Sequence, residues 1–253
     1  MAIQVNNINI LEAHKRIANL IIKTPCVYEP FLSEKLQAQI YLKLENRQRT
    51  GSFKERGAVN RLLLMTQAEK RLGVVTASAG NHAQAVAYHA SQQGIQSTIF
   101  MPLCAPEIKV THTQKFGAEV HLLGEDYDEA QQAALQFAQE SGAFYLHAYD
   151  DPWVIAGQGT VGLEILEQIP AVDLILCPVG GGGLISGIAV ALETHPIAII
   201  GIQSKTVPSM KQALESGGPV TLPTAQTIAD GIRVRRVGKL TYEICQKLIS
   251  RWV

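Results

Sequence analysis

The chain has 253 residues, which is enough for one large domain or two small ones with a core that needs no covalent crosslinks. Hydrophobic residues make up 47% and charged residues 17%, which argues against intrinsic disorder and is typical of an α/β globular protein. Lys plus Arg equals Asp plus Glu at 22 each, so no net field exists to attract nucleic acid or an anionic membrane, and a small-molecule ligand is favoured.

The cysteines and the N-terminus indicate a soluble protein of a reducing compartment. The four cysteines form no C-x-x-C pair, so neither a zinc cage nor a disulfide framework is expected. Residues 1–10 lack the basic-then-apolar layout of a signal peptide, and no run reaches the roughly 18 apolar residues of a membrane span. We therefore expect a cytoplasmic location.

From residue 71 onward, short β-branched runs alternate with longer amphipathic or alanine-rich stretches, a pattern that predicts parallel sheets covered by helices. The predicted strands are 73–77, 97–101, 118–123, 144–147, 173–179 and 197–203. The predicted helices are 81–93, 106–116, 127–141, 159–168, 184–194, 208–216 and 240–252. Gly94, Gly117 and Gly142 each follow a helical pattern, where a left-handed closing residue is favoured.

The first candidate site lies at residues 50–58, where Lys54 falls in the first turn of a predicted apolar-periodic helix. A lysine is unusual there, because the free amides of a helix start favour anions over cations. Taken alone, Lys54 is better interpreted as a solvated surface lysine than as an amine that attacks an electrophilic carbonyl.

Two further loops join a predicted strand to a predicted helix, as anion sites at helix starts do. Residues 76–83 contain small side chains that leave backbone amides bare, although, for this loop alone, an ordinary capping turn through Ser78 or Asn81 is the slightly better explanation. The run Gly180 to Gly183 costs considerable backbone entropy. A phosphate held by its main-chain N–H groups offers a better reason for that cost than a flexible turn.

A competing motif lies at residues 157–162, where Gly157, Gly159 and Gly162 match the G-x-G-x-x-G spacing of dinucleotide-binding proteins. No predicted strand directly precedes it, and the strand 173–179 begins with Asp173 instead of ending with an acidic residue. We interpret these glycines as positions of close helix packing and keep an NAD-dependent oxidoreductase as an alternative.

With these loops in order, the sequence resembles the fold-type-II pyridoxal-phosphate (PLP) enzymes, especially threonine dehydratases (threonine ammonia-lyases) and serine racemases. The segments that carry the resemblance are 42–46, 50–54, 78–82, 154–160, 178–183 and 229–231. The resemblance implies two open, mostly parallel α/β lobes with PLP in the cleft between them, as in the β-subunit of tryptophan synthase. It implies a large lobe of residues 1–68 and 149–253, a small lobe of residues 69–148, and a homo-oligomer, dimer or tetramer.

The same resemblance implies roles for individual residues. Lys54 would form the Schiff base with PLP, Phe53 would pack beside the pyridine ring, and Asn81 would bond the 3-hydroxyl oxygen. The phosphate would be held by Gly180, Gly181, Gly182, Gly183 and Leu184. The substrate carboxylate would be surrounded by Ser78, Ala79, Gly80, Asn81 and His82.

The family's chemistry implies deamination of L-threonine or L-serine by β-elimination, giving 2-oxobutanoate or pyruvate and ammonia. Racemases of the family place a serine where this chain has Ala79, which favours elimination over racemisation. Gln203 stands where the racemases carry a metal-binding glutamate, so we expect no metal.

Residues 204–253 contain no Ser-Gly-Gly-Asn-like segment for the pyridine nitrogen, so the resemblance implies a shortened chain or a pocket open on one side. A noncatalytic remnant that binds a ligand without turnover therefore stays a further alternative.

Overall fold

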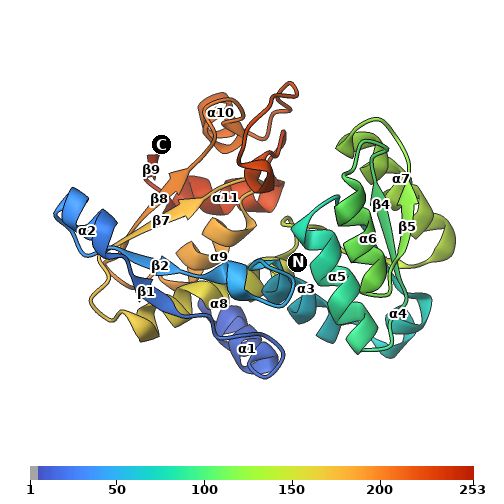
Figure 1. Ribbon diagram of the computed structural model, residues 1–253, viewed down its shortest axis with the longest axis horizontal. Coiled ribbons are helices and arrows are strands. Elements are labelled where there is room, and N and C mark those ends of the chain that lie inside the picture. Colours follow the sequence, from blue (N-terminus) through green and yellow to red (C-terminus); the bar gives the residue numbers. More distant parts are fainter. Residues whose placement is uncertain (1–4) are drawn as a thin grey trace.

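The computed structural model describes residues 5–253 and has the expected α/β class (Figure 1). A four-stranded parallel sheet and a three-stranded parallel sheet lie in separate parts of the molecule, and a two-stranded antiparallel hairpin is formed near the N-terminus. The prediction of parallel sheets covered by helices is confirmed.

The four-stranded sheet has the order β5-β4-β3-β6, and all its neighbouring strands are parallel. Its strands are β3 (Val74–Ala77), β4 (Ser97–Met101), β5 (Glu119–Leu122) and β6 (Phe144–Tyr145). Its helices are α4 (Gln67–Leu72), α5 (Asn81–Gln92), α6 (Glu107–Lys115) and α7 (Tyr127–Ser141). β3 and β4 are buried at every position, which explains why their sequences show little polar alternation.

The three-stranded sheet has the order β7-β8-β9 and is also parallel. It contains β7 (Leu174–Pro178), β8 (Ala198–Ile202) and β9 (Arg251–Trp252). Around it lie α8 (Pro152–Gln168), α9 (Gly183–Ala191), α10 (Ser209–Ser216) and α11 (Lys239–Leu248). The N-terminal part adds α1 (Asn7–Ile17), β1 (Cys26–Tyr28), α2 (Pro30–Leu36), β2 (Tyr41–Lys43) and α3 (Lys54–Leu63). Two short 3₁₀ turns complete the fold, η1 (Glu45–Arg47) and η2 (Asp230–Ile232).

Helix ends follow local sequence signals. Asp126 and Asp151 accept hydrogen bonds from the first free N–H groups of α7 and α8, and Pro152 occupies the first position of α8. Gly94, Gly117 and Gly142 all have positive φ, at 66°, 92° and 75°, so the predicted left-handed closing residues are confirmed.

The G-x-G-x-x-G motif lies wholly inside α8, where no strand-to-helix turn exists to bind a pyrophosphate. A Cβ on Gly157 would lie 2.5 Å from the carbonyl oxygen of Arg56 in α3, and one on Gly159 would lie 2.7 Å from that of Gly187 in α9. These glycines allow α8 to pack closely on both neighbours, as predicted. The dinucleotide-site alternative is therefore wrong.

The predicted helix 240–252 is wrong at its end. α11 stops at Leu248, and residues 251–252 turn back as β9 to pair with Ile200 and Gly201 of β8. The indole of Trp252 lies over Gly201, where a Cβ would come within 2.3 Å of the ring. The helix α8 also begins at Pro152, seven residues before the predicted start at 159.

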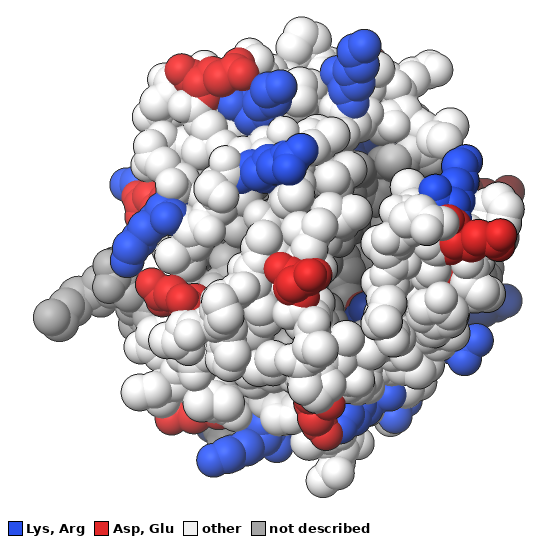
Figure 2. Space-filling model, turned by 90° about the vertical axis from the view of Figure 1, so that its left-hand side faces the viewer, with Lys and Arg blue, Asp and Glu red and all other residues white. Residues whose placement is uncertain are grey.

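Charged side chains are scattered over the face of the molecule in Figure 2. The face in Figure 2 carries lysine, arginine, aspartate and glutamate in mixed positions around a broad uncharged area, without a large patch of one sign. Within residues 5–253, no helix is long and apolar enough to cross a membrane, and all four cysteines are free thiols.

Candidate active site

Lys54 lies at the first position of α3, and its amine end is buried although the residue as a whole is half-buried. Its Nζ donates a hydrogen bond of 2.8 Å to the carbonyl oxygen of Ala148 and lies 5.4 Å from the centre of the Phe53 ring. Burial disfavours the charged form and lowers the pKa of Lys54 to about 8. The solvated-lysine interpretation is therefore wrong.

The tetraglycine loop joins β7 to α9 and is packed too closely for side chains. A Cβ on Gly181 would lie 2.4 Å from the ring of Tyr149, and Gly182 has a φ of 96°, which favours glycine. The same Tyr149 ring has its centre 6.0 Å from Lys54 Nζ. One aromatic ring therefore links the bare amides at the start of α9 to the buried amine.

A third segment covers this loop. A Cβ on Gly180 would lie 3.0 Å from Val234 and 3.1 Å from the Cα of Ile232, which ends η2. Asp230, from the Ala-Asp-Gly motif, forms an ion pair of 2.7 Å with Lys109 of α6. The segment 230–234 therefore bridges the tetraglycine loop and the part of the molecule that contains the four-stranded sheet.

The loop 78–82 follows β3 and opens α5, as the sequence predicts. Ser78, Ala79 and Gly80 are half-buried, and Ser78 Oγ accepts a hydrogen bond of 3.2 Å from the N–H of Gly80. Asn81 is exposed at the first position of α5, and His82 beside it is buried.

His82 points its Nε2 to the carbonyl oxygen of Leu146 at 3.3 Å, two residues before the carbonyl that accepts from Lys54. Because a carbonyl only accepts, Nε2 carries the proton and Nδ1 presents a lone pair. Nδ1 is buried and has no hydrogen-bond partner among residues 5–253. Burial and the nearby charge of Lys54 lower the pKa of His82 to about 3, so the ring is neutral.

The segment 147–149 contributes to the site but was not assigned to it from the sequence. His147 Nδ1 accepts hydrogen bonds from the backbone N–H groups of Tyr149 and Asp150, at 3.2 and 2.8 Å. The segment follows β6, and the carboxyl ends of parallel strands are where ligands bind in open α/β sheets. The position of residues 147–149 after a predicted strand was the sequence signal that could have assigned them to the site, because their residue types form no motif.

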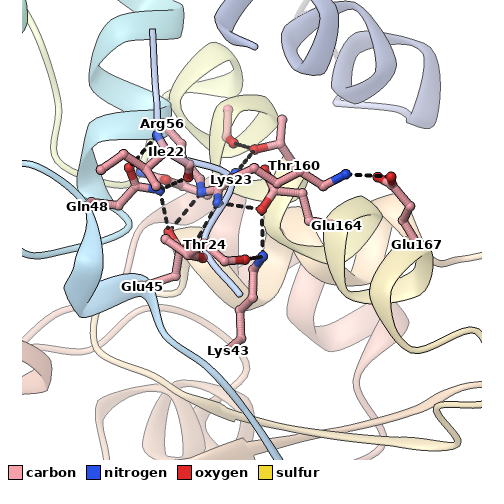
Figure 3. Close-up of polar contacts among 12 residues, drawn as sticks. Ile22, Lys23, Thr24, Lys43, Glu45, Gln48, Arg56, Thr160, Glu164 and Glu167 are labelled. Carbon is pink, nitrogen blue, oxygen red and sulfur yellow. Dashed lines mark hydrogen bonds and ion pairs between the residues drawn. The ribbon is translucent and has the colours of Figure 1, made fainter. Parts of the chain in front are cut away.

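A buried ionic network anchors the first turn of α3 through Arg56 (Figure 3). Arg56 is fully buried and pairs with Glu45 at 2.7 Å and with Glu164 of α8 at 2.7 Å. Lys43 of β2 reaches the other oxygen of Glu164 at 2.6 Å. Two positive and two negative groups therefore neutralise each other and fix the start of α3 to α8 and β2.

Gln203, at the end of β8, uses its side chain as a cap. Its Oε1 accepts from the N–H groups of Met210 and Lys211 at the start of α10, and its Nε2 donates to the carbonyl oxygen of Val179.

The site therefore combines a buried amine of lowered pKa, a bare glycine loop at a helix start and a second loop at the start of α5. A family model described as pyridoxal-phosphate dependent enzyme matches residues 17–253. The chain belongs to this family. Recognition of PLP enzymes from the sequence motifs is confirmed, and PLP is the cofactor that the family implies.

Individual relatives are also similar along most of the chain. The chain is 46% identical over 247 residues to the L-threonine ammonia-lyase of Thermotoga maritima, covering 97% of this chain and 62% of that relative. A solved structure of processed threonine deaminase isoform 2 from Solanum lycopersicum is 39% identical, with a TM-score of 0.92 over 97% of this chain and 72% of that one. The structure of maize serine racemase is 34% identical, with a TM-score of 0.95 over 99% of this chain and 77% of that one. The chain thus spans less than two thirds of the length of the Thermotoga relative.

The residues of the site fit PLP. The buried Lys54 amine suits the aldehyde carbon, and the backbone amides at the start of α9 suit a phosphate. Nδ1 of His82 is a buried acceptor without a hydrogen-bond partner in the described part of the chain, which indicates a ligand that donates to it or lies beside it.

Proposed function

We propose that this protein deaminates L-threonine, and also L-serine, by β-elimination, giving 2-oxobutanoate or pyruvate together with ammonia. The observation that carries the proposal is the Lys54 amine, which is buried and has a pKa of about 8. It lies 6.0 Å from the centre of the Tyr149 ring that packs on the glycine loop, and its charge helps to keep His82 neutral. The names of the similar threonine ammonia-lyase and threonine deaminase support the choice of substrate.

The roles in the proposed site divide between the loops. Lys54 would hold PLP covalently with Phe53 packed beside the ring, and Asn81 would bond the ring's 3-hydroxyl oxygen. The bare amides of Gly180–Gly183, with Leu184, would bind the phosphate. Ser78, Ala79 and Gly80, with Asn81 and His82, would surround the substrate carboxylate, as bare N–H groups at a helix start favour an anion.

When bound, PLP supplies an electron sink for the Cα of an attached amino acid. Lys54 would take the Cα proton at Nζ, because an amine with a pKa of about 8 is partly unprotonated near neutral pH. The β-hydroxyl then leaves as water, and one water hydrolyses the C–N bond. The net reaction converts threonine to 2-oxobutanoate and ammonia. His82 stays neutral throughout and cannot repel the protonated Lys54.

A serine racemase is the second candidate, supported by the similarity to the maize enzyme. Racemisation needs an acid or base on the opposite face of Cα, and the methyl group of Ala79 can supply neither. Ala79→Ser should therefore raise serine racemisation relative to dehydration, measured by chiral chromatography and pyruvate formation. An unchanged ratio contradicts the assignment of Ala79.

A spectrum and an assay test the proposal together. The protein mixed with PLP should gain a visible absorption band that borohydride bleaches, and Lys54→Ala should abolish it. Threonine should then yield 2-oxobutanoate, detected with a coupled dehydrogenase. A band without 2-oxo acid supports a noncatalytic ligand-binding remnant, and the absence of any band refutes the Lys54 assignment.

We also propose a cytoplasmic homo-oligomer, dimer or tetramer, which serves either threonine catabolism or isoleucine biosynthesis. The free thiols support a reducing compartment. Exposed apolar side chains on β1, α2 and β2 support self-association, namely Val27, Tyr28, Phe31, Leu36, Tyr41 and Leu42. Light scattering after size exclusion measures the oligomer.

The proposed division into a large lobe of residues 1–68 and 149–253 and a small lobe of residues 69–148 is supported by the separation of the two parallel sheets. We propose that the small lobe closes over the substrate. Small-angle scattering with and without a substrate analogue tests that closure by looking for ligand-linked compaction.

A further inference from the structure

A second buried pair lies next to Lys54 and takes no part in the proposed chemistry. Glu55 Oε2 of α3 lies 3.1 Å from Nε2 of His89 in α5, and the side chains are 0% and 4% exposed. The other oxygen of Glu55 accepts from the backbone N–H of Thr50, in the loop that leads into Lys54. One carboxylate therefore binds two separate segments of the chain.

The direction of these hydrogen bonds is settled by the ionisation of Glu55. Burial would raise the pKa of Glu55, but the hydrogen bonds from His89 and from the Thr50 N–H more than offset it, so the pKa is lowered. An ionised carboxylate only accepts, and His89 Nε2 must therefore be the donor. Hydrogen bonds to a charged group in a buried site are stronger than neutral ones.

The position of the pair connects the two sides of the site. Glu55 follows Lys54 directly on α3, and His89 lies about two helical turns beyond Asn81 and His82 on α5. Between the helices, Ala58 of α3 shares an apolar core with alanines of α5. The hydrophobic effect behind this packing is non-directional, whereas a hydrogen bond requires its two partners at a specific distance and angle. A hydrogen bond between their side chains fixes the register.

We propose that Glu55 and His89 are positioning residues that set the Lys54 amine relative to the start of α5. This rests on the proposed function, because the start of α5 would bind the substrate carboxylate and Lys54 would carry PLP. Loss of the His89 donor should let the start of α3 shift and expose the Lys54 amine.

A matched pair of variants tests the role of the Nε2 donor. In His89→Gln the amide nitrogen is as many bonds from Cα as Nε2 of the histidine, so the variant keeps a donor at that position. In His89→Asn it stands one bond closer and cannot reach Glu55. For both variants, without PLP, we measure the rate at which Lys54 reacts with acetic anhydride. Peptide mass spectrometry quantifies this rate relative to that of the exposed Lys205.

We expect His89→Gln to label Lys54 at nearly the wild-type rate and His89→Asn to label it about tenfold faster, as for the loss of a hydrogen bond to a charged group. The Kd for PLP, read from the visible band, should rise by about the same factor in His89→Asn only. Equal labelling in wild type and both folded variants overturns the proposal.

A third variant covers the case in which His89→Asn does not fold. Glu55→Leu/His89→Leu removes both partners, an exchange that often preserves stability. The proposal requires that Lys54 is labelled faster in this folded double variant than in the wild type. Labelling of the double variant at the wild-type rate overturns the proposal. Failure of the wild-type protein to form 2-oxobutanoate refutes the proposed function alone, because the labelling does not depend on turnover.

Discussion

Glu164→Gln should strongly destabilise the protein, because it removes one charge from the buried network in Figure 3. Glu164 binds Arg56 through both oxygens, at 2.7 and 2.8 Å, and its side chain is 2% exposed. The amide would leave the positive charges of Arg56 and Lys43 against Glu45 alone. Breaking a buried ion pair by removing one partner costs about 3–5 kcal/mol. That is a large share of a typical total stability of about 5–15 kcal/mol.

The assay is urea or thermal denaturation followed by circular dichroism. At about 2–4 °C per kcal/mol for a chain of this size, the melting temperature should fall by roughly 6–20 °C. Glu167→Gln is the matched control, since Glu167 lies on the same helix and pairs with Lys23, with side chains 58% and 50% exposed. Exposed pairs contribute only about 0–1 kcal/mol. Equal losses in the two variants would refute the reasoning.

The effect of Glu164→Gln should also depend on pH. Burial would raise the pKa of Glu164, but hydrogen bonds and charge from Arg56 and Lys43 more than offset it, so its folded pKa is lowered. The folded protein therefore holds fewer protons at this site than the unfolded chain does. The stabilisation that ionised Glu164 gives to the fold is complete above its unfolded pKa of about 4.3. It is lost as the pH falls through the lower pKa of Glu164 in the folded protein. The stability gap between wild type and Glu164→Gln should narrow below about pH 4.

Three more predictions follow from packing, burial and capping. Gly159→Ala should cost about 1–3 kcal/mol in urea denaturation, because its Cβ would overlap the carbonyl of Gly187. Gly218→Ala is the control, with nothing within 4 Å, and should change stability by no more than about 0.5 kcal/mol. Acetylation of Lys54 in the folded protein should follow a pKa of about 8 and in urea one of about 10.4, and equal values contradict its burial. Asp150→Ala should cost about 0.5–2 kcal/mol, because its carboxylate accepts from the first N–H groups of α11, and unchanged urea denaturation contradicts that capping role.

The central sheets were predictable because their signals are local. The strand 97–101 and the helix 127–141 match the structure at both ends. The strand has an unbroken buried run, and the helix is a capped amphipathic stretch. The hairpin β1–β2 was not predicted, since its strands have only three residues and are largely exposed. Such strands carry too little alternation to identify.

The site was predictable in its loops but not in its surroundings. Lys54 and the tetraglycine loop lie in contiguous motifs, whereas Arg56 and Glu164 meet across 108 positions of sequence, and no local pattern pairs them. The helix predicted to run to Trp252 failed for the same reason. Residues 251–252 pair with a strand some fifty positions earlier, and that tertiary contact outweighs the helical pattern that precedes it.

Three consecutive residues at the start of α3 serve three different parts of the molecule. Lys54 faces the site, Glu55 meets α5 and Arg56 meets α8. Successive helical residues point about 100° apart, so a single turn separates these directions. An inserted or deleted residue at the start of α3 would rotate all three side chains away from their partners together. We therefore expect a change in length there to do more damage than a substitution at any one of the three positions.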